Sequence, residues 1–447
     1  MTTPIVDFVK KYAESNATRL HMPGHKGESI LGVEDLDITE IDGADVLYSS
    51  NGIISESEQN ATKIFGSKKT VYSTEGSSLS IRAMLYLLKL YAKTKNIKPI
   101  IAAGRNAHKT FVTACGLLDL EVDWLFSEKN EDIISCEVTA DFLEDYLLNC
   151  SQKPLAVYIT SPDYLGNTAD IMALSKVCKK HNVLLTVDNA HGAYLKFLND
   201  SCHPIDLGAD MCCDSAHKTL PVLTGGGYLH ISATAPDFLS KNVEKAMALF
   251  SSTSPSYLIL QSLDMANKHL SGEYTNNLNK TIKAVNKLKA DLLNGGYELI
   301  GNEPLKLTIK PKAYGYTGYQ IAKILEEENI ICEFSDPDYL VMMFTPKITE
   351  LQIEKIKKAL LSIDRKNAVI DIPPRPILRE KRLTISEAIN LPAYELDIDE
   401  CEGKIAAAPT VNCPPAVPIV ICGELIDKSA VESFKYYGIN KCLVIMV

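Results

Sequence analysis

The sequence lacks any apolar run that approaches the roughly 20 residues needed for a membrane-spanning helix. It is also short of basic residues, because 46 lysines and arginines stand against 56 aspartates and glutamates, giving a formal net charge of −10. Nucleic acids and anionic membranes attract basic surfaces, so this balance argues against both as general partners. We therefore expect a protein with no nucleic-acid partner and no membrane partner.

Two common phosphate-binding signatures are missing as well. No G-x-x-x-x-G-K-[ST] segment is present, and the "TGGG" at 224–227 follows Lys218 instead of preceding a lysine. No G-x-G-x-x-G opens a first βαβ unit either. These absences exclude a P-loop nucleotide site and a typical dinucleotide site.

Cysteine patterns that bind metals are absent, although the chain has 12 cysteines. There is no C-x-x-C, and the adjacent Cys212 and Cys213 are typical of a buried strand in a reducing compartment. The N-terminus lacks the basic-then-apolar order of a secretory leader and predicts an amphipathic helix instead. We expect no metal site, no leader and a cytoplasmic location.

Helical and strand patterns alternate from about residue 50 to 265. Strands are expected within 98–104, 153–162, 182–192 and 208–218, with helices at 77–94 and 170–182. This alternation predicts an α/β fold with a largely parallel sheet, in which ligands bind at the carboxyl ends of the strands. Several polar residues and one proline fall at those ends: His108, Pro162, Asp188, His191 and Lys218.

The pattern changes after residue 270. Helices are expected at 275–296 and 349–366 and strands at 305–311 and 339–346, which indicates a smaller α+β domain. The proline-rich segment 371–382 then reads as a link to a last domain. We predict four parts: an N-terminal arm (1–50), a large domain (51–270), a small α+β domain (271–370) and a C-terminal domain (371–447).

The segment "STEGSSLSI" (73–81) places Gly76, Ser77 and Ser78 where a helix is expected to begin. Free backbone N–H groups and hydroxyls at a helix N-terminus form a natural phosphate site. Simple N-capping by serine is the alternative, and it is the commoner use of such a segment.

Three residues at neighbouring strand ends extend this site. Asp188 ends a strand, and a buried carboxylate there needs a cationic or donor partner. His191 lies three residues further on, and Lys218 follows the next strand. A lone lysine is usually a solvated charge, but a phosphate site, a strand-end aspartate and an amine together match the needs of pyridoxal 5'-phosphate.

The order of these and other motifs resembles the Orn/Lys/Arg decarboxylase family, which comprises fold-type I pyridoxal-phosphate enzymes related to aspartate aminotransferase. This resemblance implies a large domain built on a mostly parallel seven-stranded sheet. The resemblance covers nearly the whole chain and is closest to the short bacterial members that lack a wing domain. It is carried by "LHMPGHKG" (20–27), "DITEIDGADVLYSSNGII" (37–54), "IFGSKKTVYSTEGSS" (64–78), "RNAHKT" (105–110), "ITSPDYLG" (159–166), "VDNAHGAY" (187–194), "GADMCCDSAHKTLPVLT" (208–224), "STSPSYLILQSLD" (252–264) and "EGKIAAAPTVNCPPAVPIVICGELI" (402–426).

The resemblance implies a role for each matching residue. Lys218 would bind the cofactor's aldehyde, Asp188 would pair with the ring nitrogen, His108 would stack on the ring, and His191 would lie near its phenolic oxygen. Ser252 would reach the cofactor of a neighbouring subunit, so the active unit would be a homodimer. The phosphate would be held by Gly76, Ser77, Ser78, Ser215 and His217, and substrate would be touched by His21 and His25.

The implied reaction is decarboxylation of lysine, arginine or ornithine to cadaverine, agmatine or putrescine, a step of polyamine biosynthesis. The alternatives are an enzyme on the same fold with another reaction or another amino acid substrate (an aminotransferase, a lyase or a different decarboxylase), and a catalytically inactive regulator. The chain departs from the family at several positions that bear on substrate choice: Val46, Tyr48, Asn189, Tyr194, Gly225 and the segment "NCPPAVP" (412–418).

Overall fold

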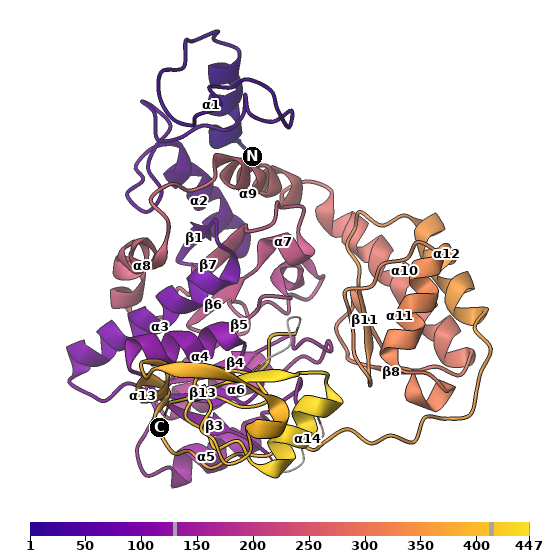
Figure 1. Cartoon of the computed structure of the whole chain (residues 1–447). Helices are drawn as coiled ribbons and strands as arrows, with labels where there is room; N and C mark the ends of the chain where they lie inside the picture. Colours follow the sequence, from indigo (N-terminus) through magenta and orange to yellow (C-terminus); the bar gives the residue numbers. More distant parts are fainter. Residues whose placement is uncertain (128–131, 411–414, 447) are drawn as a thin grey trace. The chain divides into compact units, whose positions relative to one another are not determined.

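The computed structural model describes residues 1–127, 132–410 and 415–446 (Figure 1). Its largest sheet has seven strands in the order β1-β7-β6-β5-β4-β2-β3. β2 pairs with β3 and β5 with β6 in parallel, whereas β7 runs antiparallel to both β1 and β6. The predicted α/β class with a mostly parallel seven-stranded sheet is thus confirmed. The strands are β1 (Lys69–Ser73), β2 (Ile100–Gly104), β3 (Glu121–Leu125), β4 (Ala156–Thr160), β5 (Leu184–Asp188), β6 (Met211–Asp214) and β7 (Gly227–Ile231).

Strands β2, β4, β5 and β6 lie inside the four segments expected from the sequence. The adjacent Cys212 and Cys213 are fully buried in β6, as predicted. Strands β1, β3 and β7 were not anticipated. β7 begins at Gly227, the last residue of the glycine run, where turn-forming residues mask the start of the strand.

The contacts along the chain divide it into two compact units. The first contains residues 1–99, 155–157 and 171–276, and the second contains the remainder. This division follows contacts rather than chain order, so the four predicted parts of the chain stay a prediction.

In the first unit the helices are α1 (Pro4–Ala13), α2 (Ile53–Phe65), α3 (Gly76–Lys95), α6 (Ile171–Lys180), α7 (Ala216–Thr219), α8 (Asp237–Phe250) and α9 (Tyr257–Leu270), with a 3-10 turn η1 (Ala193–Phe197).

Helix α1 has the amphipathic character that the sequence predicts and packs against α2 and α9 (Figure 1). Its apolar face buries Ile5, Val6 and Val9. Asp264 of α9 accepts hydrogen bonds from the backbone N–H groups of Ile5 and Val6 at 3.0 and 3.1 Å. These are N–H groups of the first helical turn, which have no partner within the helix, so the carboxylate satisfies them and anchors α1.

The second unit contains an antiparallel sheet in the order β10-β11-β9-β8, with α10, α11 and α12 beside it (Figure 1). The two helices and two strands expected after residue 270 correspond to α10, α12, β9 and β11. The strands are β8 (Glu298–Ile300), β9 (Lys306–Lys310), β10 (Phe334–Ser335) and β11 (Leu340–Met343), with a 3-10 turn η2 (Lys312–Tyr314). The helices of the unit are α4 (Lys109–Leu118), α5 (Ala140–Asn149), α10 (Tyr274–Asn294, whose first three residues belong to the first unit), α11 (Gly318–Glu327), α12 (Glu350–Leu361), α13 (Ile385–Ile389) and α14 (Lys428–Tyr436).

The C-terminal part of this unit is built on β12 (Ala393–Asp397) paired with β13 (Lys441–Ile445), together with the 3-10 turn η3 (Ile398–Glu400) and α14. The link 371–382 contains neither helix nor strand, apart from one β-bridge at Lys381. Residues 412–414 of "NCPPAVP" lie outside the described residues. Among the described helices, none combines the length and apolar composition that a membrane crossing requires.

Candidate functional site

Lys218 and His191 meet at the edge of the main sheet. Lys218 lies in α7, the short helix that follows β6, and its Nζ is 2.9 Å from Nε2 of His191 in the loop after β5. Because β5 and β6 are adjacent and parallel, both loops leave the sheet at the same carboxyl edge. A charged lysine has no lone pair, so in that state Nζ donates and the imidazole accepts. Two predicted catalytic residues are therefore brought together.

Asp188 is the last residue of β5 and lies opposite Cys213 in the register of the sheet. Its side chain is 2% exposed, and its Oδ1 accepts from the Ala190 N–H at 3.2 Å and from Cys213 Sγ at 3.6 Å. Burial raises the pKa of the Cys213 thiol well above its ordinary value, and the Asp188 charge adds to the shift, so Cys213 stays a neutral S–H donor. Sequence reasoning missed this thiol, because only the strand register shows which residue faces Asp188.

The first turn of α3 forms a cup with the β6–α7 loop. Ser215 Oγ donates to Ser77 Oγ at 2.8 Å, and Gly76, with φ of +67°, donates its N–H to the Gly225 carbonyl at 2.6 Å. A Cβ at Gly227 would come within 2.8 Å of the Asp214 carbonyl oxygen, so only glycine allows this close approach. Backbone N–H groups and hydroxyls are thereby gathered at a helix N-terminus, which is the chemistry that binds phosphate.

The alternative in which the serines cap α3 is wrong. The N-cap of α3 is Glu75, it makes no side-chain cap bond, and Gly76 already belongs to the helix. Ser77 and Ser78 therefore lie inside the first turn of α3 and not at its N-cap position.

His217 lies on the rim of the same cup. Its Nδ1 is 2.9 Å from the carbonyl oxygen of Gly226, and since a carbonyl only accepts, Nδ1 carries the hydrogen. Burial lowers the pKa of this imidazole, and the charge of Lys218 lowers it further. A phosphate beside Nε2 would act in the opposite direction, because a nearby anion favours the protonated ring.

The remaining predicted residues lie in other surroundings. Ser252 is exposed, and its N–H donates to Glu75 Oε1 at 2.8 Å. His21 and His25 bond within the N-terminal arm, to Tyr12 and Asp37 at 2.5 and 3.3 Å. His108 belongs to the second unit, where its Nδ1 accepts from the Thr110 N–H at 3.1 Å and so caps α4. The roles of these four residues toward cofactor or substrate stay predictions.

A second buried carboxylate, which sequence reasoning missed, lies one strand away from Asp188. Asp214 ends β6, and its Oδ2 is 3.1 Å from Nε2 of both His203 and His230. Its Oδ1 accepts from Asn189 Nδ2 at 2.6 Å. Burial opposes ionisation of Asp214, yet the two histidines hold its pKa well below the usual range. The two imidazoles and the carboxylate are close enough to hold a metal ion, but their facing atoms already hydrogen-bond one another.

Most of the departures from the family pattern have structural partners in this chain. Asn189 bonds Asp214, Tyr194 is fully buried in η1, and the Tyr48 hydroxyl donates to the Tyr72 carbonyl at 2.9 Å. Gly225 has φ of +99°, and a Cβ there would lie 2.8 Å from the Thr74 carbonyl oxygen. Val46, by contrast, is 47% exposed. Gly225 is thus required by the local backbone that shapes the cup.

The chain is similar in sequence and fold to known proteins of one family. A sequence model described as "Orn/Lys/Arg decarboxylase, major domain" matches residues 3–300. Arginine decarboxylase of Bacillus subtilis is 28% identical over 96% of this chain and 92% of its own length. The uncharacterized protein YaaO of the same organism is 26% identical over 97% of this chain and 93% of its own. The lysine decarboxylase LdcF of Francisella novicida shares the fold, with a TM-score of 0.80 at 17% identity, over 99% of this chain and 81% of its own.

Proposed function

The chain belongs to the Orn/Lys/Arg decarboxylase family, and from that premise we propose that it removes the carboxylate of a basic L-amino acid as CO2 and releases the amine. Its cofactor is pyridoxal 5'-phosphate, as in the rest of the family. The observation that carries the proposal is the Lys218–His191 contact of 2.9 Å, in the loops that follow Asp188 and the adjacent strand.

The residues at the sheet edge fit this cofactor. The cup formed by the first turn of α3 and the β6–α7 loop has the glycines, hydroxyls and N–H groups that a phosphate needs. Lys218 follows this cup directly, because it lies in α7, the short helix whose N-cap residue is Ser215. Asp188 is buried at the end of the strand whose following loop carries His191, and a carboxylate in that place suits a protonated ring nitrogen. When bound, pyridoxal 5'-phosphate supplies an aldehyde that links to amines and a cationic ring that withdraws electrons from the bond to be broken.

The residues of the chain at this site have separate roles in the proposed reaction. Asp188 would pair with the ring nitrogen, because a carboxylate stabilises a cation beside it. Lys218 would hold the cofactor through its aldehyde. The contact of 2.9 Å with His191 orients Nζ of Lys218, which places this amine to deliver a proton to Cα. His217, Ser77, Ser78 and Ser215 would hold the phosphate and so fix the position of the ring.

The finer assignments rest on family resemblance and local chemistry. By that resemblance His108 would stack on the ring, His21 and His25 would contact substrate, and Ser252 would reach the cofactor of a second subunit in a homodimer. The exposure of Ser252 is in keeping with that last role. None of the eleven described cysteines forms a disulfide, which supports a cytoplasmic enzyme. We place the reaction in polyamine biosynthesis, with arginine as the first substrate to test because the Bacillus subtilis relative is named an arginine decarboxylase.

The test is to incubate the purified holoenzyme with L-arginine, L-lysine and L-ornithine and to measure CO2 and amine together. We expect equimolar CO2 and amine from at least one of the three. Formation of a keto acid without CO2 would instead support an aminotransferase, and CO2 from none of the three would contradict the proposal.

Lys218→Ala should abolish both turnover and the visible absorbance of the lysine-bound cofactor, because no amine remains to hold the aldehyde. The matched control is Lys241→Ala, since the Lys241 side chain is 75% exposed on α8 and pairs loosely with Asp237 at 4.0 Å. The control should keep the absorbance and the activity of the wild type. Retention of the visible band in Lys218→Ala would assign the cofactor to another lysine.

A further inference from the structure

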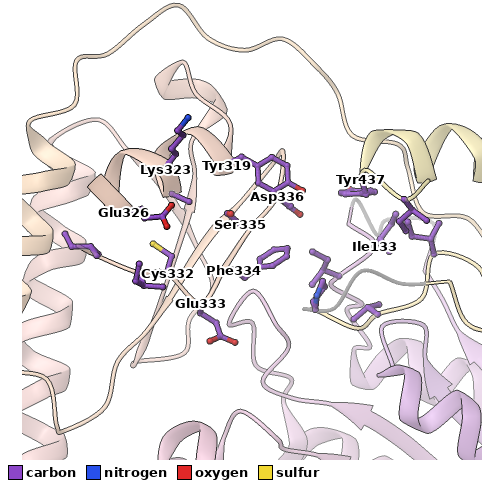
Figure 2. Close-up of a pocket in the computed structure, with 18 residues that line it drawn as sticks. Ile133, Tyr319, Lys323, Glu326, Cys332, Glu333, Phe334, Ser335, Asp336 and Tyr437 are labelled. Atoms are coloured by element: carbon purple, nitrogen blue, oxygen red, sulfur yellow. The ribbon is translucent and has the colours of Figure 1, made fainter. Parts of the chain in front are cut away.

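The second unit holds a cavity of about 710 Å³ that the proposed reaction does not use (Figure 2). Its walls come from α11, from the segment 330–336 that includes β10, and from C-terminal residues between 415 and 439. A volume of this size is typical of sites for small organic molecules. The residues that decide its chemistry are Tyr319, Glu326, Phe334, Asp336 and Tyr437.

The charge on the cavity wall is predominantly negative. Among the described lining residues, three carboxylates, from Glu326, Glu333 and Asp336, stand against one ammonium, that of Lys323. Lys323 is exposed, and Figure 2 shows its side chain extending away from Phe334 and the centre of the cavity. Glu333 is engaged, because its Oε1 accepts from the Tyr164 hydroxyl at 2.8 Å. The wall therefore disfavours phosphates and carboxylates and favours a cation.

Asp336 is the feature that points to a ligand. Its residue is 4% exposed, and its Oδ1 accepts from the backbone N–H groups of Asp338 and Tyr339 at 2.7 and 2.6 Å. Its Oδ2 is buried and has no hydrogen-bond partner among the described residues, although the side chain lines the cavity. A buried carboxylate oxygen without a donor is costly, so a donor or cation from outside the chain would relieve it.

Aromatic rings complete the wall. Phe334 lies in the centre of the view in Figure 2, with Tyr319 beside Asp336 and Tyr437 facing them from the C-terminal part. Aromatic faces attract organic cations, and the apolar side chains of Ile133 and Ile330 suit a short hydrocarbon chain. We propose that this cavity binds a small organic cation, an alkylammonium group with a short apolar chain, between Asp336, Glu326 and the aromatic rings. This inference does not depend on the reaction proposed above.

Binding of a permanent cation should depend on pH through Asp336. Burial raises the pKa of Asp336 to about 7, and the charges of Asp338 and Asp132 act in the same direction. Below that pH the side chain is protonated and neutral, so the cation is expected to bind more tightly at pH 8 than at pH 6. The other charged or titratable groups around it are Lys312, Tyr319, Lys323, Glu326, Glu333, Tyr436 and Tyr437.

The experiment is calorimetric titration of the full-length holoenzyme with n-butyltrimethylammonium. This probe is always charged and cannot form an imine, so it does not report the aldehyde chemistry of Lys218. We expect one site per chain. Asp336→Asn and Glu326→Gln should each weaken binding about tenfold, since each removes a cation's counter-charge. Asn keeps an oxygen for the two backbone N–H groups, so the turn after β10 should remain folded.

Two controls make the result decisive. Lys323→Gln should leave the affinity within about twofold, and n-hexanol, a neutral molecule of similar length, should bind at least about tenfold more weakly than the cation. Loss of the pH dependence in Asp336→Asn would support the assignment. Equal binding of cation and alcohol, equal affinity in wild type and Asp336→Asn, or no binding at all would overturn it. Because none of these measurements involves turnover, a failure here is distinguishable from a failure of the decarboxylase proposal.

Discussion

Asp188 and Asp214 are two buried carboxylates at the ends of adjacent parallel strands, and they differ in what surrounds them. Asp214 has three side-chain partners, two imidazoles at 3.1 Å and an amide at 2.6 Å. The bonds described for Asp188 come from a backbone N–H at 3.2 Å and a thiol at 3.6 Å, and both meet the same oxygen. Asp214 is thus held by three side chains that bond it closely, whereas Asp188 stands next to the loop that carries His191 and meets Lys218.

This difference separates a structural role from a functional one at equivalent positions of the sheet. A buried charge with strong partners belongs to the stability of the fold, because removing it leaves those partners unsatisfied. Asp188 instead ends the strand whose following loop carries His191, the partner of Lys218, so it stands beside the proposed cofactor site. We therefore propose that Asp188 serves the cofactor and Asp214 the fold, and matched substitutions test that proposal.

The largest effect is expected from Asp188→Ala. Loss of the carboxylate removes the group that stabilises the protonated ring, so kcat/KM should fall on the order of a thousandfold, about 4 kcal/mol. The free energy of unfolding should fall less than in Asp214→Ala, because the bonds described for Asp188 come from one backbone N–H and one thiol, whereas Asp214 accepts from three side chains. Steady-state assays and urea unfolding of the same preparation measure both quantities.

The opposite pattern is expected from Asp214→Ala. His203, His230 and Asn189 would all lose their buried acceptor, so the free energy of unfolding should fall by about 3 kcal/mol. Enzyme that remains folded should keep kcat/KM within about tenfold of the wild type, since the groups that contact cofactor are unchanged. If Asp214→Ala were stable and inactive, or Asp188→Ala unstable and active, the assignment would be reversed.

The sequence predicts which residues gather at this edge of the sheet better than it predicts the buried residues that hold them there. Lys218, Asp188 and His191 were found from strand ends, because parallel strands deliver their carboxyl ends to one edge whatever the details of packing. Asp214 stands in the same segment as Lys218, but nothing in the local pattern distinguishes it from a turn residue. Its partners are far along the chain, at His203 and His230, and the second of these lies in β7, a strand hidden by the preceding glycines.

The proposed phosphate cup also depends on backbone conformation and tertiary contacts that the sequence does not show. Its serines were predicted, yet whether they cap the helix or lie within its first turn depends on the backbone at Gly76. From the sequence, Gly225 is one of the departures that bear on substrate choice. In the fold it accepts the Gly76 N–H and has a conformation with no room for a Cβ, facts that depend on contacts between segments about 150 residues apart. Local patterns predict which groups gather, and tertiary contacts decide how they are held.

The smallest expected effect comes from the two adjacent cysteines of β6, whose side chains point to opposite faces of the strand. Cys213 donates to Asp188, whereas Cys212 Sγ lies 4.0 Å from His203 Nε2, on the side of Asp214. Cys213→Ala should lower kcat/KM about two- to threefold, because Asp188 loses one weak donor that orients it. Cys212→Ala should leave kcat/KM unchanged while lowering the free energy of unfolding by about 1 kcal/mol, through lost packing around the histidines. Assays and unfolding curves of the two variants measure these changes, and a larger loss of activity in Cys212→Ala would mean that the two carboxylates are coupled through the strand rather than independent.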